Sequence, residues 1–241
     1  MSAPVTEGAS AWVRTLGVYR TPSAWRGAYE LATTIVPFCV GWLLMLWASS
    51  HGQLWLYLLL LLPTAGLMVR LFLIQHDCGH RAFFPGQRAN DWMGRSLGVL
   101  TLTPYDHWRR CHAIHHATHG NLDRRGVGDV DTLTVAEYLA RSRWARLRYR
   151  AYRHPLVMFG IGPAFVFLLT NRFPGGFLHG GWRPWASTMG TNVAIVAAGA
   201  LTMWAFGATA LLRVHVPILM IAGSVGIWLF YVQHQFERTR W

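Results

Sequence analysis

Five histidines in two short clusters are the residues of this chain best suited to bind a metal. His76 and His80 stand four apart in QHDCGH, and His112, His115 and His116 follow the spacing i, i+3, i+4 in RRCHAIHHATHGN. On a helix, residues three or four apart share a face, so each cluster would present its imidazole rings on one stripe. Crowded imidazoles gain little from packing and repel one another when protonated. A bound transition metal removes that cost, so the spacing predicts a metal site.

The ligand types narrow the choice of metal. An all-imidazole set suits iron, copper, nickel or zinc. Structural zinc sites usually hold four ligands with cysteine prominent, whereas the three cysteines of this chain are scattered. The five clustered histidines therefore favour two metals. Asp77 and Asp106 lie next to the clusters and are candidate acceptors for histidine ring N–H groups, in a layer behind the ligands.

The composition indicates that these clusters belong to a membrane protein. Over 241 residues, 53% are hydrophobic and only 13% are charged, with a mean hydropathy of +0.25. Such a chain is too apolar for an ordinary soluble domain. The net charge is +12, and all of the lysine-or-arginine positions that produce it are arginines. Those arginines form no stripe with interleaved aromatics, so we expect a membrane and not nucleic acid as the partner.

Apolar runs of about 20 residues, the length that crosses a bilayer as a helix, predict the membrane spans. Four are predicted: Leu31–Ser49, Leu54–Ile74, Thr188–Phe206 and Val214–Val232. Short turns join them into two hairpins. We interpret two shorter stretches, Leu97–Thr103 and Pro155–Thr170, as interfacial or re-entrant helices. The predicted fold is a single all-α integral membrane domain over residues 1–241.

The arginines predict the orientation of these spans. Arginine-rich segments stay on the cytoplasmic side of a membrane. Arginines fill the long loop from Arg81 to Arg153, whereas the turns within the hairpins are almost free of them. The long loop, with its histidines, is therefore expected on the cytoplasmic face. His234, which follows the fourth span, is expected on the same side.

The motifs resemble those of the membrane fatty acid desaturases, in particular the bacterial acyl-lipid or acyl-CoA type. HDCGH is followed by HAIHH, and WLFYVQHQFE comes after the last span, so that the resemblance extends from about Thr33 to Trp241. It implies two non-haem iron ions at the cytoplasmic face of a bacterial inner membrane. It also implies that O₂ and two electrons are used to remove two hydrogens from a fatty acyl chain. By motif, the matching iron ligands are His76, His80, His112, His115, His116 and His234.

The resemblance also implies partners and shows one departure. The substrate would be a fatty acyl lipid or acyl-CoA. Because no dinucleotide fingerprint is present, electrons would come from a separate ferredoxin or cytochrome. The family carries a third, HxxHH-like box, which this sequence lacks before it ends at Trp241. We therefore expect a C-terminally truncated desaturase with an incomplete second iron site and doubtful activity.

Two other interpretations remain open at the level of sequence. A histidine-box hydroxylase or carotenoid oxygenase would use the same clusters to insert oxygen. Alternatively, the chain is a non-catalytic membrane protein that binds a metal or an acyl lipid.

Overall fold

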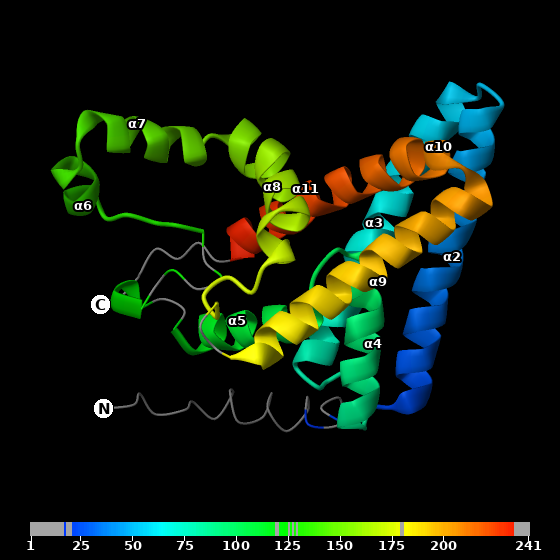
Figure 1. The fold of residues 1–241 in the computed structure, drawn as a ribbon, viewed down its shortest axis with the longest axis horizontal. Helices are drawn as coiled ribbons and strands as arrows, with labels where there is room; N and C mark the ends of the chain where they lie inside the picture. Colours follow the sequence, from blue (N-terminus) through cyan, green and yellow to red (C-terminus); the bar gives the residue numbers. More distant parts are fainter. Residues whose placement is uncertain are drawn as a thin grey trace.

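The fold contains four helices long and apolar enough to cross a membrane. The computed structural model describes residues 17, 21–118, 121–124, 126, 128, 130–178 and 181–233, and the elements in this part of the chain are all helices (Figure 1). The four candidate spans are α2 (Ala24–Ser50), α3 (Leu54–Gly79), α9 (Trp182–Phe206) and the run Ala208–Gln233. That last run comprises α10 (Ala208–Ala210), the π-helical η5 (Leu211–His215) and α11 (Val216–Gln233). The all-α fold and its four predicted spans are confirmed.

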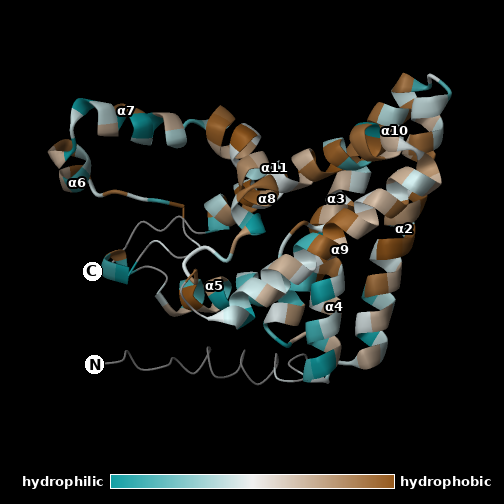
Figure 2. Ribbon diagram, in the orientation of Figure 1, coloured by the Kyte–Doolittle hydropathy of each residue, from teal (hydrophilic) through white to brown (hydrophobic). Residues whose placement is uncertain are grey.

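The long helices expose apolar side chains, as lipid-facing helices do. Trp204 and Val196 of α9 are 84% and 71% exposed, and Leu62 of α3 is 67% exposed. Figure 2 shows the apolar colouring along the long helices, with more hydrophilic residues on α4, α5 and α7. A soluble protein would not leave so much apolar surface in water, whereas a bilayer covers it.

The first two spans form a closely packed hairpin. Gly52, at φ 67°, turns the chain after α2, and Gln53 N donates to Ala48 O over 2.9 Å to close that helix. Within the hairpin, a Cβ added at Gly41 would lie 2.5 Å from Thr64 Oγ1. The absence of a side chain at Gly41 therefore lets α2 approach α3.

Helix α3 is the centre of the bundle. Its Leu71 is fully buried together with Met45 of α2 and Ile218 of α11. Because α3 packs against helices from both hairpins, its C-terminal turn, which carries the first histidine cluster, is held on several sides.

Two shorter helices follow, α4 (Gln87–Leu100) and α5 (Tyr105–Thr118). They cross at close range, since a Cβ at Gly94 would lie 2.2 Å from the Tyr105 ring and one at Gly98 would lie 2.4 Å from Thr103 O. The stretch Leu97–Thr103, expected to be interfacial or re-entrant, does not form an element of its own. Leu97–Leu100 is the last turn of α4, and Leu97 is buried in the core, while residues 101–103 form the turn into α5.

The described residues between α5 and α9 form a bent arm. It contains η2 (Leu122–Arg124), α6 (Val135–Ala140), α7 (Arg143–Tyr152), the π-helical η3 (Leu156–Ile161), α8 (Gly162–Leu168) and η4 (Thr170–Arg172). The segments Arg143–Tyr152 and Leu156–Arg172 meet at a bend of 57° and together are apolar enough for a broken span or a re-entrant loop. The stretch predicted as re-entrant, Pro155–Thr170, thus coincides with an interrupted helix.

Candidate metal centre

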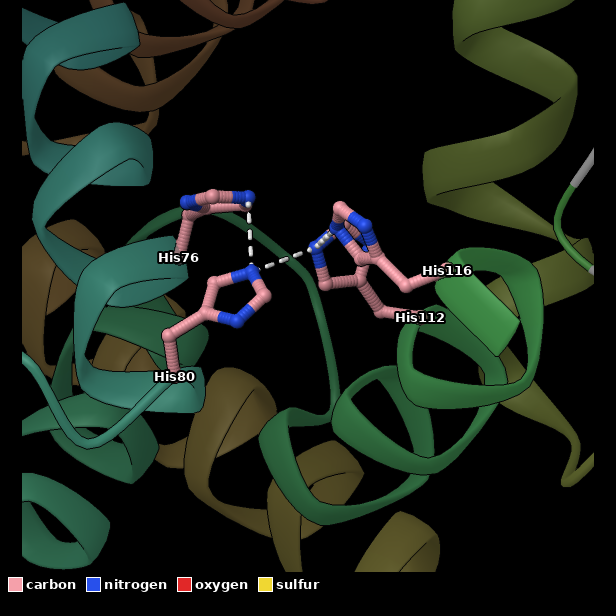
Figure 3. A group of neighbouring side chains, drawn as sticks. All are labelled: His76, His80, His112 and His116. Atoms are coloured by element: carbon pink, nitrogen blue, oxygen red, sulfur yellow. Dashed lines mark hydrogen bonds between the residues drawn. The ribbon is translucent and has the colours of Figure 1, made fainter. Parts of the chain in front are cut away.

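Four histidines from two helices converge on one point. His76 belongs to the last turn of α3 and His80 follows directly after it, while His112 and His116 lie one turn apart on α5. Figure 3 shows the two pairs facing each other. Each of the four offers a ring nitrogen, and these atoms all lie within 4.8 Å of one another. The pairs, 32 residues apart between His80 and His112, are thus joined in a single candidate site.

The converging atoms are all Nε2. His80 Nε2 lies 3.3 Å from His76 Nε2 and 3.0 Å from His112 Nε2, and His116 Nε2 lies 3.0 Å from His112 Nε2. A hydrogen bond between two such nitrogens needs a proton on one and a lone pair on the other. An Nε2 that carries a proton can donate only one hydrogen bond. The contacts among these four nitrogens therefore cannot all be hydrogen bonds. A cation at the centre would use all four lone pairs, so the donor set fits a metal ion.

Asp77 contacts the first of the four histidines. Its Oδ1 lies 3.1 Å from His76 Nδ1, which places the ring proton on Nδ1 and leaves the Nε2 lone pair directed at the other histidines. A carboxylate behind a ligating imidazole fixes its tautomer and raises its basicity. Asp77 thus lies at hydrogen-bonding distance from a ring nitrogen of His76, and its role behind a metal ligand stays a prediction.

The surroundings keep His80 and His112 neutral. Burial, and then the neighbouring His76, His116, His80 and His115, lower the pKa of His112 to about 3. Burial and the same kind of neighbours also lower the pKa of His80. Trp108 stacks on the His112 ring with a centroid distance of 4.6 Å and an interplanar angle of 16°. A neutral imidazole with a fixed ring is the form that binds a metal.

His115 does not join the group of four. It is 2% exposed, and its ring lies 5.3 Å from that of Phe230 on α11. Its centroid is 6.1 Å from that of His112 and 5.7 Å from that of His116. The expected single stripe of three is therefore divided, because His115 packs against α11 whereas His112 and His116 face the first histidine pair. His234 lies outside the described residues, and its predicted role stays a prediction.

Asp106 has other partners than the predicted histidine. Arg95 of α4 donates to both carboxylate oxygens, over 2.9 Å and 3.1 Å, and Ser187 of α9 donates over 3.1 Å. Within the described part of the chain, its expected contact to a ligating histidine is not formed. Asp106 instead joins the start of α5 to α4 and α9.

A buried polar contact behind His76 was not foreseen from the sequence. Gln75 is fully buried, its Oε1 accepts from Thr101 Oγ1 over 2.6 Å, and its Nε2 donates to Thr103 O over 3.4 Å. A buried amide must be hydrogen bonded, so this contact ties the end of α3 to the turn that precedes α5. A glutamine inside an apolar helix, next to a histidine motif, was the available signal.

Tyr105 forms a second tie between the two helices that carry the converging histidines. It is 1% exposed, and its hydroxyl donates to Cys78 O over 2.9 Å and lies 3.3 Å from Asp91 Oδ1. Arg109, one turn along α5, donates to the same Asp91 oxygen over 3.2 Å. Cys78 lies between His76 and His80, so this hydrogen bond fixes α5 directly against the first histidine pair.

Comparison with known proteins agrees with this geometry. The family model described as "Fatty acid desaturase" matches residues 53–241. A "Fatty acid desaturase" of Bacillus subtilis (strain 168) is 45% identical over 222 residues, which cover 92% of this chain and 62% of the relative. A Synechocystis "sn-1 acyl-lipid omega-3 desaturase (ferredoxin)" is 31% identical over 185 residues, covering 71% of this chain and 48% of the relative.

The coverage is unequal, since the chain spans less than two thirds of the length of these relatives. No solved structure matches the chain. The family match extends over both histidine clusters and the second hairpin, and it includes all four converging histidines. The chain belongs to the fatty acid desaturase family.

Proposed function

We propose that this chain is a membrane fatty acid desaturase that introduces a double bond into a fatty acyl chain with O₂ as the oxidant. The observation that carries the proposal is the convergence of four imidazole Nε2 atoms from two helices, in a chain of this family. Side chains of the protein have no chemistry for removing hydrogen from a methylene group, so a bound cofactor must supply it.

In this proposal His76, His80, His112 and His116 hold non-haem iron, which supplies the O₂-dependent oxidation when bound. His115 and His234 are the proposed ligands of a second iron. The neutral state of His80 and His112 and the Asp77 contact to His76 support the first assignment. The protein then contributes position: Trp108 fixes the plane of His112, and Tyr105 and Gln75 fix one helix against the other.

The substrate and the electron donor are assigned by chemical class. The name of the Synechocystis relative gives an acyl-lipid substrate and a ferredoxin. We propose for this chain a fatty acyl lipid or acyl-CoA and a separate ferredoxin- or cytochrome-type donor. Two electrons from the donor, two protons from the solvent and two hydrogens with their electrons from the substrate together reduce O₂ to two waters.

We also propose a location. The histidine site lies at the ends of α3 and α11, and the arginine-rich segments 81–153 follow the same end. By the distribution of arginine, this side faces the cytoplasm of a bacterial inner membrane.

Expression in a bacterium without a desaturase of its own tests the function. Fatty acids are analysed by mass spectrometry after growth under ¹⁸O₂, for the wild type, for His112→Ala and for His51→Ala, a control in the turn at the opposite end of α3. We expect unlabelled, newly unsaturated fatty acids from the wild type and the control only. The iron affinity of the four-histidine site should fall more than about tenfold in His112→Ala, since even residues behind a ligand contribute 10- to 100-fold.

Two outcomes would contradict the proposal. An ¹⁸O-labelled hydroxy product would assign the chain to the hydroxylases. Unchanged fatty acids in a strain whose purified protein carries iron would assign it to the non-catalytic metal-binding proteins.

A further inference from the structure

Helix α7 carries an apolar stripe that contacts no other part of the described chain closely enough to be covered. Trp144 and Leu147 are 81% and 55% exposed, and Ala151, one turn further, is also exposed. These residues have the spacing i, i+3, i+7 and therefore lie on one face. They line a shallow surface groove with Ser142, Ala145 and Arg148.

Arginines flank this stripe on both sides. By helical geometry, Arg143 and Arg150 lie along one edge and Arg148 along the other. All three are exposed, and α7 contains no acidic residue. An apolar face bordered by long cationic side chains matches the boundary between acyl chains and anionic headgroups, because the arginines can reach outward while the stripe is buried.

The position of α7 agrees with that boundary. Only three residues separate it from the apolar segment that begins at Leu156, which is 74% exposed. At its C-terminal end, Arg153 donates to Tyr231 OH over 3.1 Å, and Tyr231 lies near the end of α11. Phe230, the preceding residue of α11, contacts His115. The end of α7 thus lies at the same end of the spans as the histidine site.

We propose that α7 lies in the surface of an anionic membrane, with Trp144, Leu147 and Ala151 among the acyl chains and Arg143, Arg148 and Arg150 on lipid phosphates. The bend of 57° between α7 and the apolar segment that follows it lets α7 lie along the membrane surface at an angle to that segment. The helix therefore anchors the long loop to the bilayer on the side of the histidine site. This inference does not depend on the proposed desaturase activity.

Site-directed spin labelling of the full chain tests the proposal. Leu147→Cys is labelled with a nitroxide in a Cys39→Ser background, because Cys39 is the exposed cysteine whereas Cys78 is buried and Cys111 is partly buried. The protein is placed in nanodiscs of phosphatidylcholine alone or of phosphatidylcholine with phosphatidylglycerol. Collision with O₂, which enters lipid, is compared with collision with a water-soluble nickel chelate.

We expect the anionic lipid to reduce nickel collisions at position 147 by at least about threefold, as headgroup attraction draws the helix inward. The triple variant Arg143→Gln/Arg148→Gln/Arg150→Gln should lose this response. The matched variant Arg81→Gln/Arg88→Gln/Arg124→Gln removes the same charge from exposed positions outside α7 and should keep it.

Three results would overturn the proposal. The first is nickel access at position 147 that is high and equal in both lipids. The second is protection that does not depend on lipid charge or on the three arginines. The third is protection that appears only when an acidic soluble protein is added, which would assign the stripe to a protein partner.

Discussion

Thr101 donates a 2.6 Å hydrogen bond to the side-chain oxygen of Gln75, the residue next to His76, and both side chains are buried. The bond connects the turn before α5 with the end of α3. The two histidine pairs lie at these helices. The distance between the pairs therefore depends on a hydrogen bond that involves none of the four histidines.

Replacing Gln75 with leucine should destabilise the protein by about 1–3 kcal/mol, because Thr101 Oγ1 loses its buried acceptor. Thermal unfolding in detergent, followed by circular dichroism, measures the loss. The double variant Gln75→Leu/Thr101→Val removes both partners and should recover part of the stability. Gln87→Leu, at an exposed position of α4, is the control and should change little. Additive effects of the two single changes would show that the hydrogen bond does not couple α3 to the turn.

Tyr105→Phe removes the hydroxyl that bonds Cys78 O and Asp91. The Cys78 carbonyl keeps the Arg81 N–H and Asp91 keeps Arg109, so the expected loss is modest, about 1 kcal/mol. The same unfolding measurement applies, and Tyr29→Phe at a 61% exposed position is the matched change. Equal stability of the two variants would mean that the Tyr105 hydroxyl contributes nothing to the tie.

Gly94→Ala should disrupt the crossing of α4 and α5. Its new Cβ would lie 2.2 Å from a ring carbon of Tyr105, and that ring is buried and cannot swing aside. Overpacking of this kind costs about 1–3 kcal/mol or more. Gly66→Ala in α3 meets nothing within 4 Å and serves as the control. If both variants unfold at the wild-type temperature, the close approach of α4 to Tyr105 is not present in solution.

Asp77→Ala should weaken metal binding without unfolding the protein. Loss of the acceptor at His76 Nδ1 lowers the basicity of that ligand, and such losses reduce metal affinity by about 10- to 100-fold. Because the Asp77 side chain is 55% exposed, we expect a value near the lower end. Titration with Co²⁺, read by its visible absorption, gives the affinity. Asp123→Ala, at an exposed site on η2, should bind Co²⁺ as the wild type does.

The sequence by itself determined the features that depend on local periodicity. Apolar runs longer than the bilayer thickness predicted four spans, and the structure has a long helix at each of them. The spacing of four residues predicted that His76 would share a face with His80, and His112 with His116, because that spacing is one helical turn. The aspartate behind His76 followed from its adjacency in the chain.

Only the tertiary structure decided how those local features combine. The two histidine pairs meet because Gly94 and Gly98 let α5 pass close against α4. His115 is separated from the four converging histidines because α11 lies alongside α5. Asp106 pairs with Arg95 because α4 also lies alongside α5. Gln75 gains its role from Thr101, 26 residues away. Contacts between residues so distant in the chain leave no periodic signal, since they depend on the packing of several helices at once.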